Sequence, residues 1–560
     1  MSYNTNNLME KERLLKLAYA SNPKDANVLI QLGLLEFSKT NLGIGNDKFA
    51  YEFFEKSFDS NYVENTTSVN TKQGRWLAFI IGRYNYQLNN YKKAEKFFKL
   101  ADSSVIDNDD SHKIQLATNI TGYPESVEDA KNVIKNYNSR MDKLLTQKDI
   151  NISFIKSDIY NSCVLSPFNL EIYYEADFKS CMSKYYNLVK KAFPELNYKS
   201  ESLLFKHSES VYKIGIASAF LYSGNSVISD FGGVIDKLLE LPQFDITFIY
   251  IVENNYNENT FVFKNRKNFV FETDKNPNWL EEARNKISSL NLDLLLYLDS
   301  TMSPSVQKTL MSKLAKVQAV SHGHPVTSGV DSEIMDYYVS WGAAELDYEI
   351  AKNHYTEKLI LLPKQYMHQY YSPRTKNGIS NLNKMPFDQL TRKDFISEKF
   401  SSDSTNWYTC MQKPFKRHPE FDYMLTEIIK KDKNGIIILH GSDNDENHEI
   451  ICNRLKKYNI DMDRVHFIPV QPHHRLMALY KLSDVILDSY YAGGCTTTRE
   501  ALEIGAPVVT LPGKYLGGRW SLAYYQIMGV LDLVAKDKED YIKIALKIGT
   551  NIDYKNKVKK

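Results

Sequence analysis

The stretch SYYAGGCTTTREALEIGAPVVTLPG (Ser489–Gly513) places small and hydroxylated residues where a strand is followed by a helix. The residues DVILDSY are typical of a buried strand, TTTREALEIG of a helix that stops at Gly505, and APVVTLP of a second strand. Gly493 and Gly494 permit a tight turn and a close approach of the backbone to a ligand. The stretch therefore predicts one unit of a parallel α/β sheet.

The start of this helix is suited to an anion. Thr496, Thr497 and Thr498 open the helix, where free N–H groups and the positive end of the helix dipole favour a guest such as a diphosphate. Glu500 falls in the first turn, where a carboxylate can accept hydrogen bonds from ribose hydroxyls. Ordinary helix capping is the alternative, since threonine is a good N-cap residue, and the loop taken alone favours capping.

Short apolar segments alternate with helical stretches on both sides of a polar linker at 372–404. The expected strands are KIGIASAF, FDITFIYIV, LDLLLYLD, VQAVSHGHP, YYVS and KLILLP before the linker, and GIIILHG, VHFIPV, DVILDSY and APVVTLP after it. This alternation predicts two doubly wound, Rossmann-like α/β domains with mostly parallel sheets. Two such domains place a ligand cleft between the carboxyl ends of their strands.

The N-terminal part has a repeated helical layout. In LGLLEFSK and FAYEFFEKSFDSN, Gly33 is followed by Phe54, and in IIGRYNYQLNNYKKAEKFFKLADSS, Gly82 is followed by Phe98. The small residues let two helices approach closely and the aromatic ring fills the space between them, as in the tetratricopeptide repeat. Since such solenoids usually need three or more repeats, a degenerate third is expected over 126–145. An ordinary helical bundle is the alternative.

Composition narrows the class of protein. The net charge of +2, from 70 basic and 68 acidic residues, argues against a nucleic-acid-binding protein. Five widely spaced cysteines without a C-x-x-C pair indicate a reducing compartment. The N-terminus lacks the apolar core of a signal peptide, and no run approaches the ~18 apolar residues of a membrane span. We therefore expect a soluble, cytoplasmic protein with no membrane span.

Several motifs in order resemble glycosyltransferase family 41. They are KVQAVSHGHPVTSGVDSEIMDYYVS, HYTEKLILLP, QKPFKRHPEFD and RVHFIPVQPHHRLMALYKLSDVILDSYYAGGCTTTREALEIGAPVVTLPG. That family holds the O-linked N-acetylglucosamine transferases, the plant Spindly-type enzymes and bacterial cytoplasmic N-glucosyltransferases. The resemblance covers residues 10–545 and is strongest over 295–365 and 405–540. Its motifs together are far more specific than a single glycine-rich loop.

The resemblance implies a GT-B type α/β fold preceded by an all-α tetratricopeptide-like domain. The expected parts are helical repeats (1–145), a mixed connector (146–205), the acceptor-side lobe (206–371), the linker (372–404) and the nucleotide-sugar lobe (405–560). The implied activity is inverting, metal-independent transfer of N-acetylglucosamine or glucose from a UDP-sugar to a Ser, Thr or Asn side chain of a protein. The repeats would bind the protein acceptor, and no cofactor is expected. The alternatives are a glycan or small-molecule acceptor, a GDP-sugar donor, or a non-catalytic repeat scaffold.

The resemblance assigns the diphosphate to Lys416, Thr496 and Thr497 and the ribose to Glu500. Lys416 is a catalytic candidate, because a fixed ammonium stabilises the leaving diphosphate more in the transition state than in the ground state. Gln412, one turn earlier, is expected to contact the same phosphates or the sugar.

The rest of the donor site follows by family position, with Gly494 and Cys495 in the glycine loop and Val470, Gln471 and His474 around the base. His474 and its neighbour in VQPHH are equally well explained as exposed turn residues. Cys495 stands where the animal enzymes carry histidine, so a main-chain contact would survive there but a histidine side-chain contact would not.

On the acceptor side, His324 faces the cleft by family position, as a general base or an orienting group. A histidine that hydrogen-bonds its own loop is the alternative. His322 and Thr327 are supporting candidates. Asn225 takes the place of a histidine that the family often carries, and asparagine cannot act as a general base at neutral pH. Catalysis would then rest on positioning and on stabilisation of the diphosphate.

Overall fold

The structure is a computed structural model. It describes residues 5–41, 47–57, 72–88, 90–102, 110–152, 176–204, 210–252, 257–273, 276, 278–321, 326–366, 389–442 and 447–559. The acceptor-side candidates His322 and His324 lie outside these ranges. The chain forms two compact units, of which the first comprises Met1–Thr121 and Lys148–Ser157 and the second Gly122–Gln147 and Asp158–Lys560.

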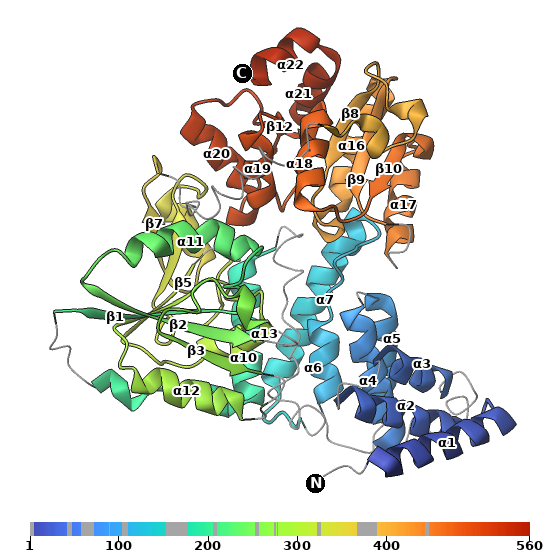
Figure 1. Ribbon diagram of the computed structural model, residues 1–560, viewed down its shortest axis with the longest axis vertical. Coiled ribbons are helices and arrows are strands. Elements are labelled where there is room, and N and C mark those ends of the chain that lie inside the picture. The colour runs from blue at the N-terminus through green and yellow to red at the C-terminus, as the bar shows by residue number, and fades with distance from the viewer. Residues whose placement is uncertain are drawn as a thin grey trace. The chain divides into compact units, whose positions relative to one another are not determined.

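The first unit is all-helical, and its consecutive helices pack against one another (Figure 1). Its helices are α1 (Thr5–Ser21), α2 (Ala26–Asn41), α3 (Asp47–Ser57), α4 (Lys72–Gln87), α5 (Tyr91–Asp102) and α6 (Ser111–Thr118). A Cβ atom added to Gly33 of α2 would lie 2.4 Å from Cε1 of Phe54 in α3, and one added to Gly82 of α4 would lie 2.7 Å from Cδ1 of Phe98 in α5. The same glycine–phenylalanine contact thus recurs in two successive helix pairs, as the sequence predicts.

The segment 126–145, expected as a third repeat, forms the single helix α7 (Val127–Thr146). Its N-cap is Ser126, whose hydroxyl accepts a hydrogen bond of 3.1 Å from the N–H of Asp129. The helix belongs to the second unit, where it packs on α10 (Phe178–Ala192). Tyr137 of α7 donates a 2.9 Å hydrogen bond to the carbonyl oxygen of Cys181 in α10.

The N-terminal lobe of the second unit is a seven-stranded parallel sheet in the order β3-β2-β1-β4-β5-β6-β7. Its strands are β1 (Tyr212–Ser218), β2 (Phe244–Val252), β3 (Asn268–Glu272), β4 (Leu294–Tyr297), β5 (Val317–Ser321), β6 (Tyr337–Trp341) and β7 (Lys358–Leu362). Its helices include α11 (Ser226–Leu238), α12 (Trp279–Ser289), α13 (Pro304–Leu310) and α14 (Tyr348–Ala351). Helices α11 and α12 lie on opposite faces of the sheet, as doubly wound topology requires (Figure 1).

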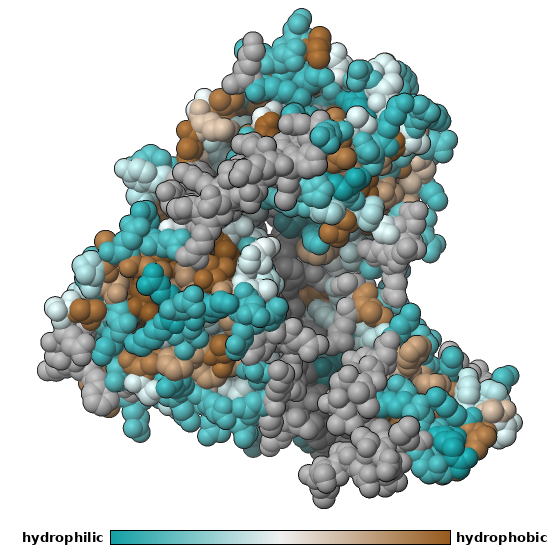
Figure 2. All heavy atoms as spheres, viewed as in Figure 1, coloured by the Kyte–Doolittle hydropathy of each residue, from teal (hydrophilic) through white to brown (hydrophobic). Residues whose placement is uncertain are grey.

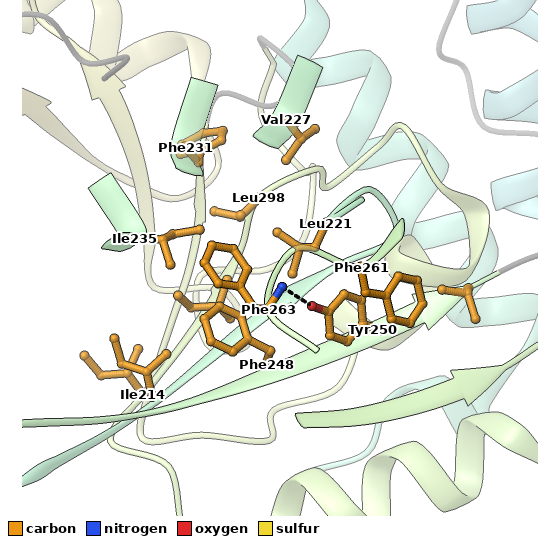
Figure 3. Packing of buried hydrophobic residues seen from close by; sticks show 13 residues of the cluster. Ile214, Leu221, Val227, Phe231, Ile235, Phe248, Tyr250, Phe261, Phe263 and Leu298 are labelled. Carbon is orange, nitrogen blue, oxygen red and sulfur yellow. Dashed lines mark hydrogen bonds between the residues drawn. The ribbon is translucent and has the colours of Figure 1, made fainter. Parts of the chain in front are cut away.

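Aromatic side chains fill the core between this sheet and α11 (Figure 3). The rings of Phe248 and Phe263 stack with centroids 4.3 Å apart, and those of Tyr250 and Phe261 with centroids 4.1 Å apart. The buried Tyr250 hydroxyl accepts a 3.2 Å hydrogen bond from the main-chain N–H of Phe263. This bond satisfies a polar group that would otherwise destabilise an apolar core.

The C-terminal lobe is a five-stranded parallel sheet in the order β10-β9-β8-β11-β12. Its strands are β8 (Asn406–Cys410), β9 (Gly435–His440), β10 (Val465–Ile468), β11 (Val485–Leu487) and β12 (Val508–Val509). Its helices are α16 (Pro419–Lys431), α17 (His448–Lys457), α18 (His473–Leu482), α19 (Thr496–Glu503), α20 (Trp520–Met528), α21 (Lys538–Thr550) and α22 (Ile552–Lys559). The visible face of this lobe is mostly polar, with isolated hydrophobic residues between polar ones (Figure 2). The prediction of two doubly wound parallel sheets is confirmed.

The two lobes contact each other through α20 and the end of β6. Arg519, which precedes α20, donates a 2.7 Å hydrogen bond to the carbonyl oxygen of Ala344. Trp341 of β6 stacks on Trp520 and lies 5.5 Å from the ring of Tyr524, both in α20. Because all three rings are nearly inaccessible to solvent, this contact buries apolar surface of both lobes.

Candidate active site

Asp488, the residue after β11, holds the glycine-rich loop in place. Its buried carboxylate accepts hydrogen bonds from the Gly494 N–H at 2.7 Å, the Thr510 hydroxyl at 2.8 Å and the Ser521 hydroxyl at 2.6 Å. Burial raises the pKa of Asp488, and these hydrogen bonds oppose that rise. Three donors from three different segments thus fix the loop between β11 and α19.

Gly494 is a glycine because other atoms occupy the space of a side chain. A Cβ atom at this position would lie 2.4 Å from Nε2 of Gln412 and 2.5 Å from Oγ1 of Thr498. In that space Gln412 donates a 2.6 Å hydrogen bond to Oγ1 of Thr497. The structure therefore brings together Gln412, Gly494 and Thr497, three of the residues predicted to bind the donor.

Lys416 lies beside the same loop, at the end of a 3-10 turn (Pro414–Lys416) that follows β8. Its Nζ donates a 3.1 Å hydrogen bond to the carbonyl oxygen of Gly493, and the described residues give it no second hydrogen-bond partner. Burial lowers the pKa of Lys416, and the neighbouring Cys495 and Asp488 raise it. Its ammonium group therefore has hydrogen-bonding capacity left for an anionic ligand.

The first turn of α19 carries no side-chain cap. Its N-cap residue is Cys495, whose side chain makes no capping hydrogen bond. Of the threonines that follow, Thr498 pairs with the Ser521 hydroxyl at 3.0 Å, and Thr496 donates to Oδ1 of Asp230 at 3.4 Å. The alternative of ordinary capping is therefore not what the structure has, and the N-terminal N–H groups keep their affinity for anions.

The start of α18 contacts α19 at Glu500, which lies beyond the first turn of the helix, whereas the sequence predicted it within that turn. His473, at the start of α18, pairs with Glu500, with 2.9 Å between Nε2 and Oε1. The hydrogen bond to Glu500 raises the pKa of His473. Of the base-pocket candidates, Val470 is 72% exposed, Gln471 donates to a main-chain carbonyl of its own loop, and His474 is partly exposed. The sequence assigned His474 to the base, but it is its neighbour His473 that pairs with Glu500.

The described acceptor-side candidates support local structure. Asn225 is the N-cap of α11, where Oδ1 accepts from the Val227 N–H at 2.9 Å and Nδ2 donates to the Tyr222 hydroxyl at 3.0 Å. Thr327 is fully buried and donates a 2.6 Å hydrogen bond to Oε2 of Glu357. Their predicted roles toward an acceptor stay predictions.

Two charged residues that lie close to α19 and Lys416 were not predicted as site residues from the sequence. Asp230 of α11 reaches across from the N-terminal lobe, with Oδ1 3.3 Å from NH2 of Arg499 in α19. Arg417, the neighbour of Lys416, is 1% exposed, and none of its three guanidinium nitrogens has a hydrogen-bond partner among the described residues. Burial lowers the pKa of Arg417, whose guanidinium carbon lies 6.0 Å from the Phe467 ring centroid.

Residues 399–560, which contain the glycine loop, Lys416 and Glu500, match the model of Glycosyl transferase family 41. The C-terminal lobe is thus similar to glycosyltransferase family 41. The probable UDP-N-acetylglucosamine–peptide N-acetylglucosaminyltransferase SPINDLY of Solanum lycopersicum is 23% identical over 274 residues, which are 48% of this chain and 27% of the relative. The UDP-N-acetylglucosamine–peptide N-acetylglucosaminyltransferase of Caenorhabditis elegans is 33% identical over 104 residues, which are 18% of this chain and 9% of that protein. The chain thus spans about a quarter of the length of the plant relative it matches.

Among solved structures, a mutant of the Thermobaculum terrenum O-GlcNAc transferase is similar, with a TM-score of 0.58 and 16% identity over 99% of this chain and 88% of that one. This likeness and the two parallel sheets confirm the GT-B type fold expected for a family 41 domain and its partner lobe. In the described part of the chain, no helix is long and apolar enough to cross a membrane. No group of three His, Cys, Asp or Glu side chains is placed to hold a metal ion among those same residues.

Proposed function

We propose that the chain is an inverting, metal-independent glycosyltransferase that moves N-acetylglucosamine or glucose from a UDP-sugar to a protein side chain. The observation that carries this proposal is the meeting of Lys416, Gln412 and Thr497 over the uncapped start of α19. A cation, an amide and a helix N-terminus converge there, and these groups suit a diphosphate.

The proposed chemistry is a single displacement at the anomeric carbon of the sugar. The acceptor oxygen or nitrogen forms a bond to this carbon while the bond to the diphosphate oxygen breaks, and that oxygen takes the bonding electrons. The acceptor proton leaves to a base or to solvent. Lys416 and the N–H groups of α19 stabilise the charge that develops on the diphosphate, which is where such catalysis gains most of its rate.

We assign the ribose and the base to Glu500 of α19 and to the start of α18. Glu500 is partly buried and already engaged by His473, so its carboxylate is oriented before a nucleotide binds. The two relatives are named as UDP-N-acetylglucosamine–peptide N-acetylglucosaminyltransferases, which supports UDP-N-acetylglucosamine as donor and a peptide as acceptor. The helical repeats of the first unit are the proposed acceptor-binding surface.

The test begins with thermal unfolding of the full chain with UDP, GDP and their sugar conjugates, because a ligand of the native state raises its stability by RT ln(1 + [L]/Kd). We expect UDP and one UDP-sugar to raise the Tm, with that sugar then transferred to peptides with inversion at the anomeric carbon. A response to GDP compounds alone would change the donor to a GDP-sugar. The absence of any response would replace the proposal with a non-catalytic scaffold.

A further inference from the structure

A carboxylate of the N-terminal lobe touches the helix that is proposed to bind the diphosphate. Oδ1 of Asp230 accepts a 3.4 Å hydrogen bond from the Thr496 hydroxyl and lies 3.3 Å from NH2 of Arg499. Asp230 is 8% exposed and Arg499 5% exposed. This ion pair is therefore largely shielded from solvent, where charge–charge interactions are stronger than at an open surface.

We propose that Asp230 is a positioning residue of the donor site, which holds Thr496 until the diphosphate of the donor takes over the hydrogen bond of this threonine. The inference rests on the proposed function, because it requires an anionic donor group at the start of α19. Asp230 acts through Thr496 and Arg499 and does not itself touch the donor.

The Thr496 hydroxyl can serve either the Asp230 carboxylate or a phosphate oxygen of the donor, because it has a single proton to donate. A threonine hydroxyl has one proton, so it can donate to the Asp230 carboxylate or to a phosphate oxygen, but not to both. A carboxylate and a diphosphate at the same helix end also repel each other. A donor that accepts the Thr496 hydroxyl proton therefore breaks the Thr496–Asp230 hydrogen bond, and Arg499, which has five N–H donors, remains to neutralise Asp230.

Replacement of Asp230 by a phosphate oxygen as the acceptor of the Thr496 hydroxyl affects the contact between the two lobes. Asp230 lies in α11, whose N-cap is Asn225, one of the residues expected on the acceptor side. After Thr496 is released, the ion pair between Asp230 and Arg499 still connects α11 to α19. The presence of a donor would thereby change how firmly the acceptor-side helix is held to the donor-binding helix.

The opposite charges of Asp230 and Arg499 give the inference a directional test, with UDP titrated calorimetrically into the full chain. In Asp230→Asn we expect the Kd for UDP to fall by about threefold or more, because a competing acceptor and a repelling charge are removed. In Arg499→Met we expect the Kd to rise by a similar factor, because the carboxylate loses its counter-charge. The double variant should return close to the wild-type Kd. Asp236→Asn, a charge change on the same helix, is the control and should leave the Kd unchanged.

A purely structural role of Asp230 would raise the Kd in both single variants, together with a loss of Tm in each. A Kd that rises or stays constant in Asp230→Asn, while wild type binds UDP normally, would overturn this inference and leave the proposed function standing. If wild type binds no nucleoside diphosphate at all, both the proposed function and this inference are overturned.

Discussion

Lys416 donates a 3.1 Å hydrogen bond to the carbonyl oxygen of Gly493, and the next residue of that loop, Gly494, donates its N–H to the buried Asp488. The glycine loop thus connects the proposed diphosphate-binding cation to a carboxylate at the end of β11. Because Asp488 is held by three donors, the position of Lys416 is set before any ligand arrives. Such preorganisation is what makes a charge effective in a transition state.

Lys416→Met should lower the rate of sugar transfer by about a hundredfold or more, since one charged stabiliser of the leaving group is lost. The Tm should not fall, because a partly buried ammonium whose pKa is lowered by burial is replaced by an apolar chain of similar length. Transfer rates and thermal unfolding measure the two effects. Lys413→Met, which changes an exposed lysine in the same loop, is the matched control and should retain the wild-type rate. A near-normal rate in Lys416→Met would remove the lysine from the mechanism.

Gly494→Ala should lower the free energy of unfolding by about 1–3 kcal/mol, the usual range for overpacking a filled site. The added Cβ would lie 2.4 Å from Nε2 of Gln412, so the Gln412 side chain must shift from the position in which it donates to Thr497. Urea unfolding measures the loss. In the double variant with Gln412→Ala, part of the loss should return because one of the colliding groups is gone. Strictly additive effects of the two changes would mean that the side chains do not share this space.

The sequence pattern predicted ten of the twelve strands that lie in the described residues, and there are physical reasons why it missed the other two. Strand β3 (NFVFE) is an edge strand whose residues are all half-buried, so its apolar signal is weak. Strand β8 (NWYTC) is the central strand of its sheet and is largely buried. Its polar side chains weaken the apolar pattern that predicts a buried strand, although they are paired inside the lobe. Within it, Tyr408 donates to Asp432 at 2.8 Å, and the Thr409 and Ser483 hydroxyls lie 2.7 Å apart.

The site was predictable where residues are neighbours in sequence and unpredictable where they meet through the fold. The loop from Gly494 to Thr497 and the motif lysine could be found from their order along the chain. Asp230 could not, because it precedes Arg499 by 269 positions and joins it only when two separate sheets come together. The role of Asp488 could not be predicted for another reason. An aspartate directly after a strand such as DVIL usually belongs to an ordinary loop, so nothing in the sequence marks it as a buried acceptor.

Arg417→Met should raise the free energy of unfolding by about 1–4 kcal/mol, the range known for buried ion pairs that are replaced by apolar side chains of similar volume. Within the part of the chain that the structure describes, the buried Arg417 guanidinium has no hydrogen bond, so its removal relieves a desolvated charge. Arg454→Met is the contrasting control, since Arg454 holds the buried Asp422 with bonds of 2.7 and 2.9 Å. There we expect a loss of about 3–5 kcal/mol. Denaturant unfolding of both variants decides the matter, and a loss of stability in Arg417→Met would reveal an anionic partner of that guanidinium.

His418→Asn should flatten the dependence of stability on pH below neutrality. Burial, with help from the nearby charges of Arg454 and Lys538, lowers the pKa of His418 to about 3, from an ordinary value of 6.5. As the pH falls below 6.5, the unfolded chain gains a proton on this histidine while the folded chain does not. The folded state therefore loses up to about 1.4 kcal/mol for each pH unit between 6.5 and about 3.

Asparagine keeps the capping role at this position, because Nδ1 of His418 accepts from the Glu420 N–H at 3.3 Å and asparagine is a preferred N-cap residue. The variant should be less stable at pH 7, where it loses the ring contact with Tyr491, whose centroid lies 4.7 Å away. Its deficit should shrink or reverse at pH 5, because asparagine takes up no proton. Urea midpoints at pH 7, 6 and 5 for wild type, His418→Asn and the partly exposed control His474→Asn measure this difference. Parallel pH profiles for wild type and His418→Asn would mean that His418 is protonated in the folded protein, in contradiction to its burial.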